Sequence, residues 1–224
     1  MAEDAGSDAV LVARLRCRDE AAFTSVVESW SPGMTRVARS FLTTSDSADE
    51  VVQDTWVAVI RGLDAFEGRS SLRTWVYRIL VNTAKRRGER ESRSVPWSSW
   101  WTDQAESEGP TVDAARFQGP DDPYPGHWRE LPHAWNPESE ALTTELRTTV
   151  NDSVHRLPSR QRIVVTLRDI EGCTSEEVCS ILGITAANQR VLLHRARAAV
   201  RRDLEAYFES TGPHPEDAGQ EVTR

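Results

Sequence analysis

The sequence has no hydrophobic stretch long enough to cross a bilayer, because no run of about twenty apolar residues occurs in it. Its N-terminus lacks a basic segment followed by an apolar one, which is the pattern of a secretory signal. Cysteine is scarce: Cys17, Cys173 and Cys179 are the 3 residues, and their spacing is not that of a metal site. These absences predict a cytoplasmic protein with reduced thiols, and we expect no metal or other cofactor.

An excess of positive charge is also absent. The chain has 27 basic residues against 35 acidic ones, a formal net charge of −8, which is the wrong sign for a protein that binds DNA over its whole surface. The basic residues gather in two segments, however: residues 71–93 hold seven against two acids, and residues 156–202 hold nine against four. Residues 94–145, between them, hold two bases and ten acids. Contact with a polyanion should therefore be confined to the two basic segments.

The second basic segment has the pattern of two helices joined by a tight turn. Thr174 and Glu177 have the spacing of a capping box, which predicts the start of a short helix. Gly183 ends it, since glycine readily adopts the positive φ found just past a helix. Thr185 is the N-cap candidate of a second helix that extends beyond Leu204. The apolar positions of the first helix and of the corner are Val178, Ile181, Leu182 and Ile184.

Arginine crowds the second of these helices at positions 190, 195, 197, 201 and 202. Such a helix repels itself unless an anionic partner offsets its charge. Arginine suits phosphates and guanine edges, because its planar fork donates two parallel hydrogen bonds. The pattern favours a helix-turn-helix DNA reader, although a short helix, a glycine turn and a second helix also occur in any small helical bundle.

The N-terminal part predicts further amphipathic helices. Apolar spacing over residues 10–42 fits two or three of them, punctuated at Pro32 and Gly33. A second capping-box spacing, Ser47 to Glu50, predicts a helix of about four turns that ends near residue 62. Its apolar side consists of Val52, Trp56, Val59 and Leu63. Its polar side, with Gln53 and Asp54, would ordinarily be solvated.

A turn-rich loop over residues 64–71 precedes a helix expected over 72–88. Leu72, Val76, Ile79 and Thr83 are predicted to point inward. The other faces carry Arg73, Tyr77, Arg78, Asn82, Lys85 and Arg86. Basic residues with an aromatic residue and an asparagine on one helix suit contact with a DNA strand, and a solvated basic face is the alternative. Trp75 is predicted to be a core residue.

Residues 94–137 show no helical or strand period and hold five of the eight tryptophans among many Pro, Gly and acidic residues. A featureless segment of this length predicts an interdomain linker whose tryptophans dock on a neighbouring domain or partner. Helical spacing returns from about residue 138 and breaks at Leu157-Pro158. A further helix is expected from Arg160 to Ile170, and residues 209–224 are predicted to be a disordered tail.

Two ordered motif sets resemble the extracytoplasmic-function (ECF) family of RNA polymerase sigma factors. The first set is DEAAF, SADEVVQDTW and LRTWVYRILVNTAKRR, and the second is LPSRQRIVVTLRDIEGCTSEEV and LGITAANQRVLLHRAR. The resemblance implies an all-α fold of two small helical domains. These are sigma region 2 over residues 10–93 and the region 4 helix-turn-helix over residues 138–208.

The resemblance also implies roles for individual residues. The core-polymerase-binding set is Glu50, Gln53, Asp54 and Trp56. The set that recognises the −10 element is Phe66, Gly68, Arg69, Ser70, Arg73, Tyr77, Arg78, Asn82, Lys85 and Arg86. The set that contacts the −35 element is Thr174, Asn188, Arg190, Val191, His194, Arg195 and Arg197.

The function implied is therefore that of a promoter-specificity subunit, not an enzyme, with the RNA polymerase core, promoter DNA and an anti-sigma factor as partners. One alternative is a stand-alone helix-turn-helix regulator, which would need a dimer surface and a palindromic site. A second alternative is an interaction adaptor whose active part is the tryptophan-rich segment.

Overall fold

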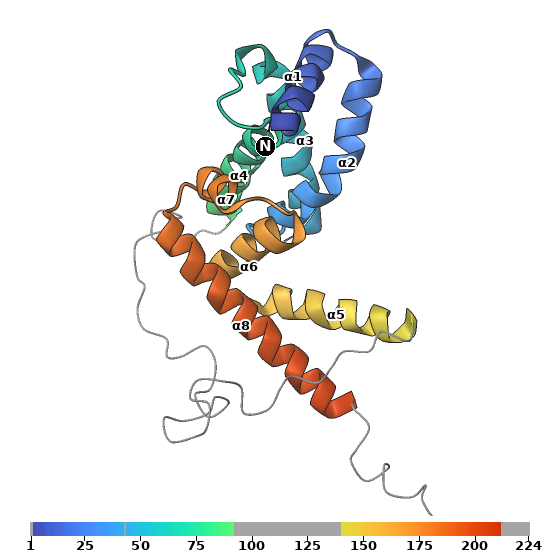
Figure 1. Ribbon diagram of the computed structural model, residues 1–224, viewed down its shortest axis with the longest axis vertical. Helices are drawn as coiled ribbons and strands as arrows, with labels where there is room; N and C mark the ends of the chain where they lie inside the picture. Colours follow the sequence, from blue (N-terminus) through green and yellow to red (C-terminus); the bar gives the residue numbers. More distant parts are fainter. Residues whose placement is uncertain (1, 43, 92–139, 212–224) are drawn as a thin grey trace, which may run out of the picture. The chain divides into compact units, whose positions relative to one another are not determined.

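The computed structural model of the protein describes residues 2–42, 44–91 and 140–211 (Figure 1). Its α-helices are α1 (Ala2–Arg16), α2 (Glu20–Ala38), α3 (Ser45–Gly62), α4 (Leu72–Glu91), α5 (Glu140–Arg156), α6 (Ser159–Val165), α7 (Ser175–Leu182) and α8 (Ala186–Thr211). A 3₁₀ turn, η1 (Leu63–Ala65), follows α3, and a π-helical segment, η4 (Thr166–Ile170), follows α6. Within these ranges there is no strand, which confirms the all-α fold. The predicted linker and residues 212–224 of the predicted tail lie outside the described residues.

The described chain forms two compact units. The first holds the described residues of 1–105 together with 159–193, and the second holds those of 106–158 together with 194–224. This grouping by contact differs from the predicted domains over residues 10–93 and 138–208, whose bounds stay a prediction. Across the described ranges, no helix has both the length and the apolarity that a membrane span requires.

Helix α2 runs without interruption through Pro32 and Gly33, so the prediction that these residues punctuate it was wrong. The helix begins at an N-cap, Asp19, whose carboxylate accepts a hydrogen bond from the Ala22 N–H at 3.0 Å. A proline inside a helix removes one backbone hydrogen bond. The buried face that follows it, including Met34 and Val37, packs in the core, and we infer that this packing offsets the lost bond.

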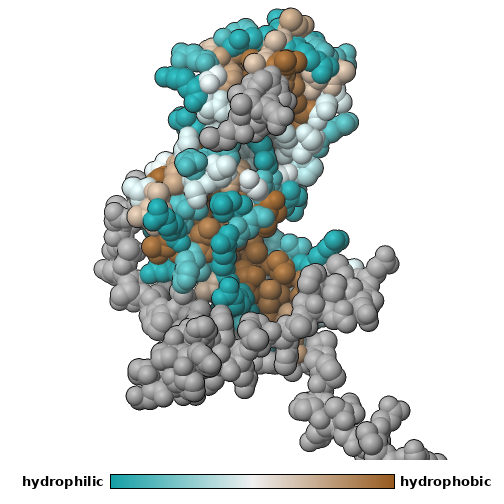
Figure 2. Space-filling model, viewed as in Figure 1, coloured by the Kyte–Doolittle hydropathy of each residue, from teal (hydrophilic) through white to brown (hydrophobic). Residues whose placement is uncertain are grey.

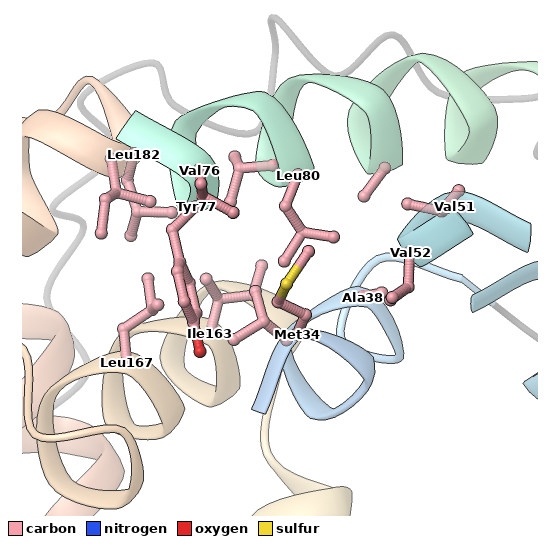
Figure 3. Close-up of a cluster of buried hydrophobic side chains, with 14 of the residues drawn as sticks. Met34, Ala38, Val51, Val52, Val76, Tyr77, Leu80, Ile163, Leu167 and Leu182 are labelled. Carbon is pink, nitrogen blue, oxygen red and sulfur yellow. The ribbon is translucent and has the colours of Figure 1, made fainter. Parts of the chain in front are cut away.

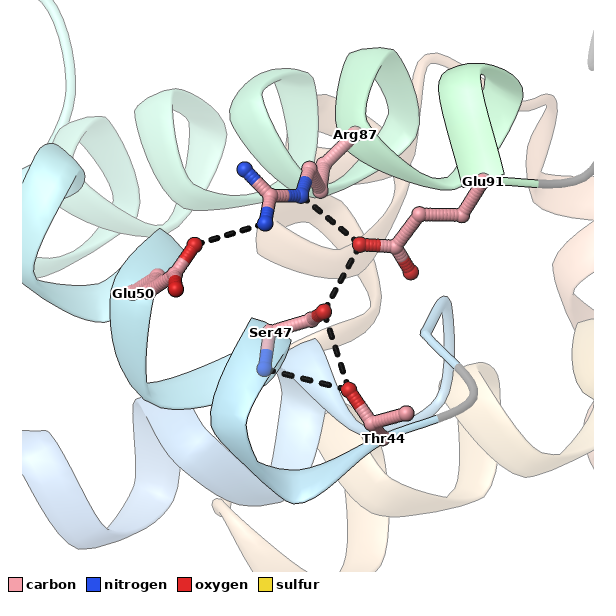
Figure 4. A network of polar contacts seen from close by, with 5 residues as sticks. All are labelled: Thr44, Ser47, Glu50, Arg87 and Glu91. Carbon is pink, nitrogen blue, oxygen red and sulfur yellow. Dashed lines mark hydrogen bonds and ion pairs between the residues drawn. The ribbon is translucent and has the colours of Figure 1, made fainter.

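The N-cap of α3 is Thr44 instead of the predicted Ser47. The Thr44 hydroxyl accepts a hydrogen bond from the Ser47 N–H at 3.2 Å, so the helix starts two residues before Ser47. Figure 4 shows what the two predicted box residues do instead. Ser47 donates to Glu91 at the end of α4, and Glu50 forms an ion pair with Arg87 at 2.6 Å. The side chains serve contact between two helices, which sequence spacing alone does not reveal.

The larger of two apolar clusters in the first unit packs α4 against α2, α3 and α7, and Ile163 and Leu167 reach the same cluster (Figure 3). Because α4 is covered on two sides, its buried stripe is wider than an amphipathic helix normally needs. Of the predicted inward residues, Leu72 and Val76 are buried, whereas Ile79 and Thr83 are only half-buried. The remaining buried apolar positions on α4 are Tyr77, Leu80, Val81 and Ala84.

The helix-turn-helix forms as the sequence predicts. Thr174 and Glu177 make both hydrogen bonds of the capping box at the start of α7. Gly183 has a φ of 70° and ends the helix. The Thr185 hydroxyl accepts a hydrogen bond from the Asn188 N–H at 3.2 Å and thereby caps α8. These local signals confirm the predicted helix, turn and second helix.

The second unit joins α5 to the later turns of α8 by polar contacts. Asp203 accepts hydrogen bonds from Ser153 and from Arg156, the latter at 2.9 Å. The Tyr207 hydroxyl donates to Glu145 at 3.0 Å. The hydrogen bonds from Ser153 and Arg156 lower the pKa of the Asp203 carboxyl, so this contact is made by a charged group near neutral pH.

Candidate nucleic-acid and polymerase interfaces

The polar face of α3 carries three of the four predicted polymerase-binding residues. Glu50, Gln53 and Asp54 are exposed. Trp56 is buried instead, and its indole N–H donates to the Ser31 hydroxyl at 3.0 Å. Its ring packs against Phe23, with centroids 5.8 Å apart. The structure thus places Trp56 in the core that supports this face, because an aromatic ring at helical spacing with other apolar residues buries more surface inward.

Two exposed apolar residues on α3 were given no role in the sequence analysis. Val57 is 45% exposed and Ile60 is 57% exposed. The signal that could have found them is their position outside the apolar spacing of Val52, Trp56 and Val59. Together with the polar residues of the same helix they give α3 an amphipathic outer surface, which suits a protein partner better than a nucleic acid.

The loop before α4 presents Gly68 and Arg69 at its tip. Gly68 has a φ of 70°, and the side chain of Arg69 is 86% exposed beside Glu67. Phe66 is buried, however, and packs on Trp75 with ring centroids 5.1 Å apart. Phe66, which is predicted to contact DNA, anchors the loop in this structure, because its side chain packs in the smaller apolar cluster with Leu63 and Leu72.

The outer face of α4 exposes Arg78, Asn82 and Arg86, which follow one another at fourfold spacing and therefore share one side of the helix. Lys85 is half-buried and donates to the Leu182 carbonyl at 3.4 Å, and burial lowers the pKa of its amine. The predicted −10 set therefore divides. Its outer members form a basic row, whereas Tyr77 is fully buried and Arg73 is half-buried.

Arg73 and Tyr77 are covered by Glu171, a residue that the sequence analysis did not single out. The Glu171 carboxylate pairs with Arg73 at 3.2 Å and with Arg36 of α2 at 2.8 Å, and it accepts a hydrogen bond from the Tyr77 hydroxyl at 3.0 Å. Burial, followed by the nearby charge of Glu171, raises the pKa of Tyr77, so its hydroxyl stays protonated. No sequence signal marks Glu171, because its partners lie far away in the chain.

A second carboxylate covers the start of α4. Glu177, which belongs to the α7 capping box, also accepts hydrogen bonds from the Ser71 and Thr74 hydroxyls at 3.2 and 2.9 Å. Burial opposes its ionisation, but the hydrogen bonds from Thr174, Thr74 and Ser71 prevail and lower the pKa of Glu177. The carboxylate is therefore charged near neutral pH, and it occupies hydroxyl donors beside the predicted −10 loop.

Helix α8 begins in the first unit with Arg190 and Val191 exposed and Asn188 half-buried. Gln189 is buried and accepts a hydrogen bond from the Ser175 hydroxyl at 3.5 Å, so it supports the turn. Thr174, at the α7 cap, is exposed. An arginine beside a valine at the start of an exposed helix can offer a guanine edge two donors and a thymine methyl an apolar contact.

The later turns of α8 belong to the second unit and carry the other predicted −35 residues. His194 and Arg197 are exposed there and Arg195 is half-buried, and Arg201 and Arg202 beyond them are exposed. Figure 2 shows hydrophilic residues over much of the visible described surface, with smaller hydrophobic patches between them. Exposed guanidinium groups on a chain of net negative charge provide local anion-binding surfaces.

Comparison with known families matches both halves of the chain. Residues 26–94 match the family profile described as Sigma-70 region 2, and residues 149–200 match the profile described as Sigma-70, region 4. The ECF RNA polymerase sigma-E factor of Escherichia coli (strain K12) is 31% identical over 87% of this chain and 92% of its own length. The sigma-E factor of Haemophilus influenzae is 29% identical over 89% of this chain and 96% of its own.

Two solved structures share the fold. CnrH, in complex with the cytosolic domain of CnrY, has a TM-score of 0.54 at 23% identity, over 89% of this chain and 97% of that one. The sigma factor RpoE from Bartonella quintana, in complex with the anti-sigma factor NepR, has a TM-score of 0.53 at 20% identity, over 82% and 96%. At these identities the likeness extends to the fold alone.

Proposed function

Since the chain belongs to the ECF family of RNA polymerase sigma factors, we propose that it binds the core polymerase and directs it to promoters through their −10 and −35 elements. The observation that carries this function is that an acidic chain exposes arginines on two separate helices, α4 and α8. If phosphate contact is confined to those helices, the chain has two separate DNA-contact sites, and recognition of two promoter elements requires two such sites.

The −35 element is read by α8. Arg190 is the first candidate for base readout, because it is exposed at the helix start and an arginine–guanine pair is the commonest specific contact in the major groove. Val191 lies beside it and suits a thymine methyl. His194, Arg195 and Arg197 follow along the helix and are assigned to contacts near the backbone, with Thr174 and Asn188 completing the set.

The −10 element is held by the loop tip and by the outer face of α4. The loop tip presents backbone and side-chain donors from Gly68, Arg69 and Ser70. These donors face a single strand from which one base has flipped out. Arg78 and Asn82 continue that surface along α4 and contact the strand through phosphates and base edges. Phe66 contributes by fixing the loop, since its ring is buried against Trp75.

The polymerase is held by α3. Glu50, Gln53 and Asp54 supply acceptors, and the exposed Val57 and Ile60 supply apolar area of the kind that partner surfaces bury. We place the chain in the cytoplasm, where it catalyses no reaction itself. The match to region 2 favours this function over a stand-alone regulator, which needs only the helix-turn-helix.

Run-off transcription tests the function. Purified core polymerase is incubated with candidate promoter fragments, with and without the chain, and the labelled RNA is separated by size. A product of defined length is expected only when core and chain are both present. Absence of product from every candidate promoter, while the same core responds to an unrelated sigma factor, would contradict the proposal.

A further inference from the structure

The Glu171 carboxylate occupies a socket built entirely from donors of α2 and α4. The two guanidinium groups, Arg36 and Arg73, approach its two oxygens, and the Tyr77 hydroxyl donates to the oxygen that Arg73 contacts. The Arg73 guanidinium also lies over the Tyr77 ring, 5.2 Å from its centroid, so the donors support one another. Figure 3 shows Tyr77 extending from α4 toward the segment that carries Ile163 and Leu167.

Backbone shape contributes to this socket as well as charge. A Cβ built on Gly33 would lie 2.2 Å from Glu171 Oε2 and 2.7 Å from the Tyr77 hydroxyl. Glycine at this position of α2 therefore makes the space that the anion occupies. Two guanidinium groups, which can only donate, and one hydroxyl that donates here match the needs of an oxyanion that carries one negative charge.

We propose that Arg36, Arg73 and Tyr77 form a phosphate socket for the single promoter strand, and that Glu171 fills this socket when η4 packs on α2 and α4. The inference rests on the proposed function and adds Arg36 to the strand-binding residues. A carboxylate and a phosphodiester each bear one negative charge and accept from the same donors, so the two compete for the same place.

The position of the socket favours a nucleic-acid strand as the competing ligand. It lies on α4, the helix whose outer face exposes Arg78, Asn82 and Arg86. The neighbouring hydroxyls of Ser71 and Thr74 are likewise occupied by a carboxylate, that of Glu177. Two internal acids thus cover donors on the inner side and first turns of α4, next to the loop to which the proposed function assigns −10 contact. Strand binding at the socket and packing of η4 against it exclude each other, which makes the free chain a weak strand binder.

The test measures strand affinity of the full chain by fluorescence anisotropy. The probe is a labelled, mixed-sequence deoxyoligonucleotide of about twelve nucleotides, within the site sizes that basic grooves cover. Glu171→Gln should bind the oligonucleotide roughly tenfold more tightly. The glutamine amide has no negative charge, and its N–H group faces the arginine and tyrosine donors without accepting from them, so it competes less well with a phosphate. Glu176→Gln, the same charge change at an exposed position of α7, should bind like the original chain. Equal gains in both variants would overturn the socket.

Arginine substitutions in the Glu171→Gln chain locate the phosphate. Arg36→Ala should remove the gain and reduce the slope of log affinity against log salt by about 0.7, the value for one phosphate contact on a single strand. Arg39→Ala, an exposed arginine three residues along the chain from Arg36, should keep the gain. If Arg36→Ala and Arg39→Ala reduce the affinity for the oligonucleotide equally, the gain arises from the general positive potential of the surface and not from a socket. That result would overturn the inference.

A second variant covers the case in which Glu171→Gln disturbs folding, as monitored by helical circular dichroism. Glu171→Asp keeps the charge but shortens the side chain by one methylene, so it cannot meet both arginines and should give an intermediate gain. No gain from a folded Asp variant would overturn the socket. This test can fail independently of the proposed function. If the chain directs run-off transcription but Glu171→Gln gives no gain in strand affinity, only the socket is overturned. If the gain is present but no transcript forms, only the proposed function is overturned.

Discussion

At the scale of single residues, buried polar groups carry the contacts that sequence reasoning could not anticipate. Glu171 is 9% exposed and meets two arginines and a tyrosine from α2 and α4. A buried carboxylate is retained only when its charge is compensated and its oxygens accept hydrogen bonds. The socket therefore makes stability sensitive to small changes of shape around one carboxylate.

Gly33→Ala tests that sensitivity. Its Cβ would come within 2.2 Å of Glu171 Oε2, and we expect the free energy of unfolding to fall by about 1–3 kcal/mol, as for other overpacked sites. In a Glu171→Ala chain the same substitution should cost less, because the nearest obstructing oxygen is gone and only the Tyr77 hydroxyl, 2.7 Å from the Cβ, stays close, and because alanine favours a helix over glycine. Urea unfolding of the four chains measures this coupling. An equal cost in both backgrounds would contradict the contact.

Arg190→Ala tests base readout at the start of α8. Loss of a bidentate guanine contact should weaken binding to the preferred −35 duplex by about 1–3 kcal/mol and relax the preference at one base pair. Affinities are measured on a set of duplexes that differ at single positions. A loss of the same size on every duplex would indicate a phosphate contact and would rule out base readout by this residue.

Residue burial divides the predicted site residues into an exposed group and a buried group, and their contacts stay predictions. Arg69, Arg78, Asn82 and Arg190 are exposed as their predicted contacts require. Trp56 and Phe66, with Tyr77 and Arg73, were chosen by their place in a motif, and burial depends on neighbours that a motif does not specify. Aromatic side chains bury a large apolar area when they pack, so they are favoured in the core.

At the scale of elements, local signals predicted helix ends well wherever the cap stabilises only its own helix. The Thr174–Glu177 box and the positive φ of Gly183 appear in the structure as the spacing predicts. The Ser47–Glu50 spacing failed because Thr44, three residues earlier, offers a competing cap. Pro32 did not end α2, since packing of a buried face outweighs the loss of one hydrogen bond.

Gly183→Ala isolates the backbone requirement of the turn. A Cβ at this residue would meet no atom within 4 Å, so any cost arises from the φ of 70° alone. We expect a loss of about 1–2 kcal/mol in the free energy of unfolding, the penalty of a left-handed L-residue. Ser180→Ala, at an exposed position on α7, should change it by less than about 0.5 kcal/mol. A neutral Gly183→Ala would mean that the turn adapts to another conformation.

Gln53→Ala tests the outer face of α3. Gln53 is exposed, so its truncation should leave the free energy of unfolding within about 0.5 kcal/mol of the original value. Affinity for core polymerase should fall, as measured by fluorescence titration, while binding to an isolated −35 duplex stays unchanged. Weakening of both interactions would point to misfolding and would withdraw the evidence for α3 as the polymerase contact.

At the scale of the whole molecule, the net charge argues against DNA binding, whereas the distribution of the charges favours it. A chain with 35 acids and 27 bases is repelled by DNA at long range, yet two helices expose rows of arginine. The acids Glu171 and Glu177 lie directly on part of the first basic segment. Sequence patterns could locate the basic segments, but they could not show this cover, because Arg36 and Glu171 are 135 positions apart in the chain.

The proposal for the whole molecule is that two basic surfaces engage one promoter while α3 holds the polymerase. Footprinting of one promoter fragment tests it most directly, with nuclease to report duplex protection and permanganate to report unpaired thymines. With core polymerase and chain together, we expect protection at the −35 element and reactive thymines confined to the −10 element, and neither signal from core alone. Protection without reactive thymines, or identical patterns with and without the chain, would contradict the proposal.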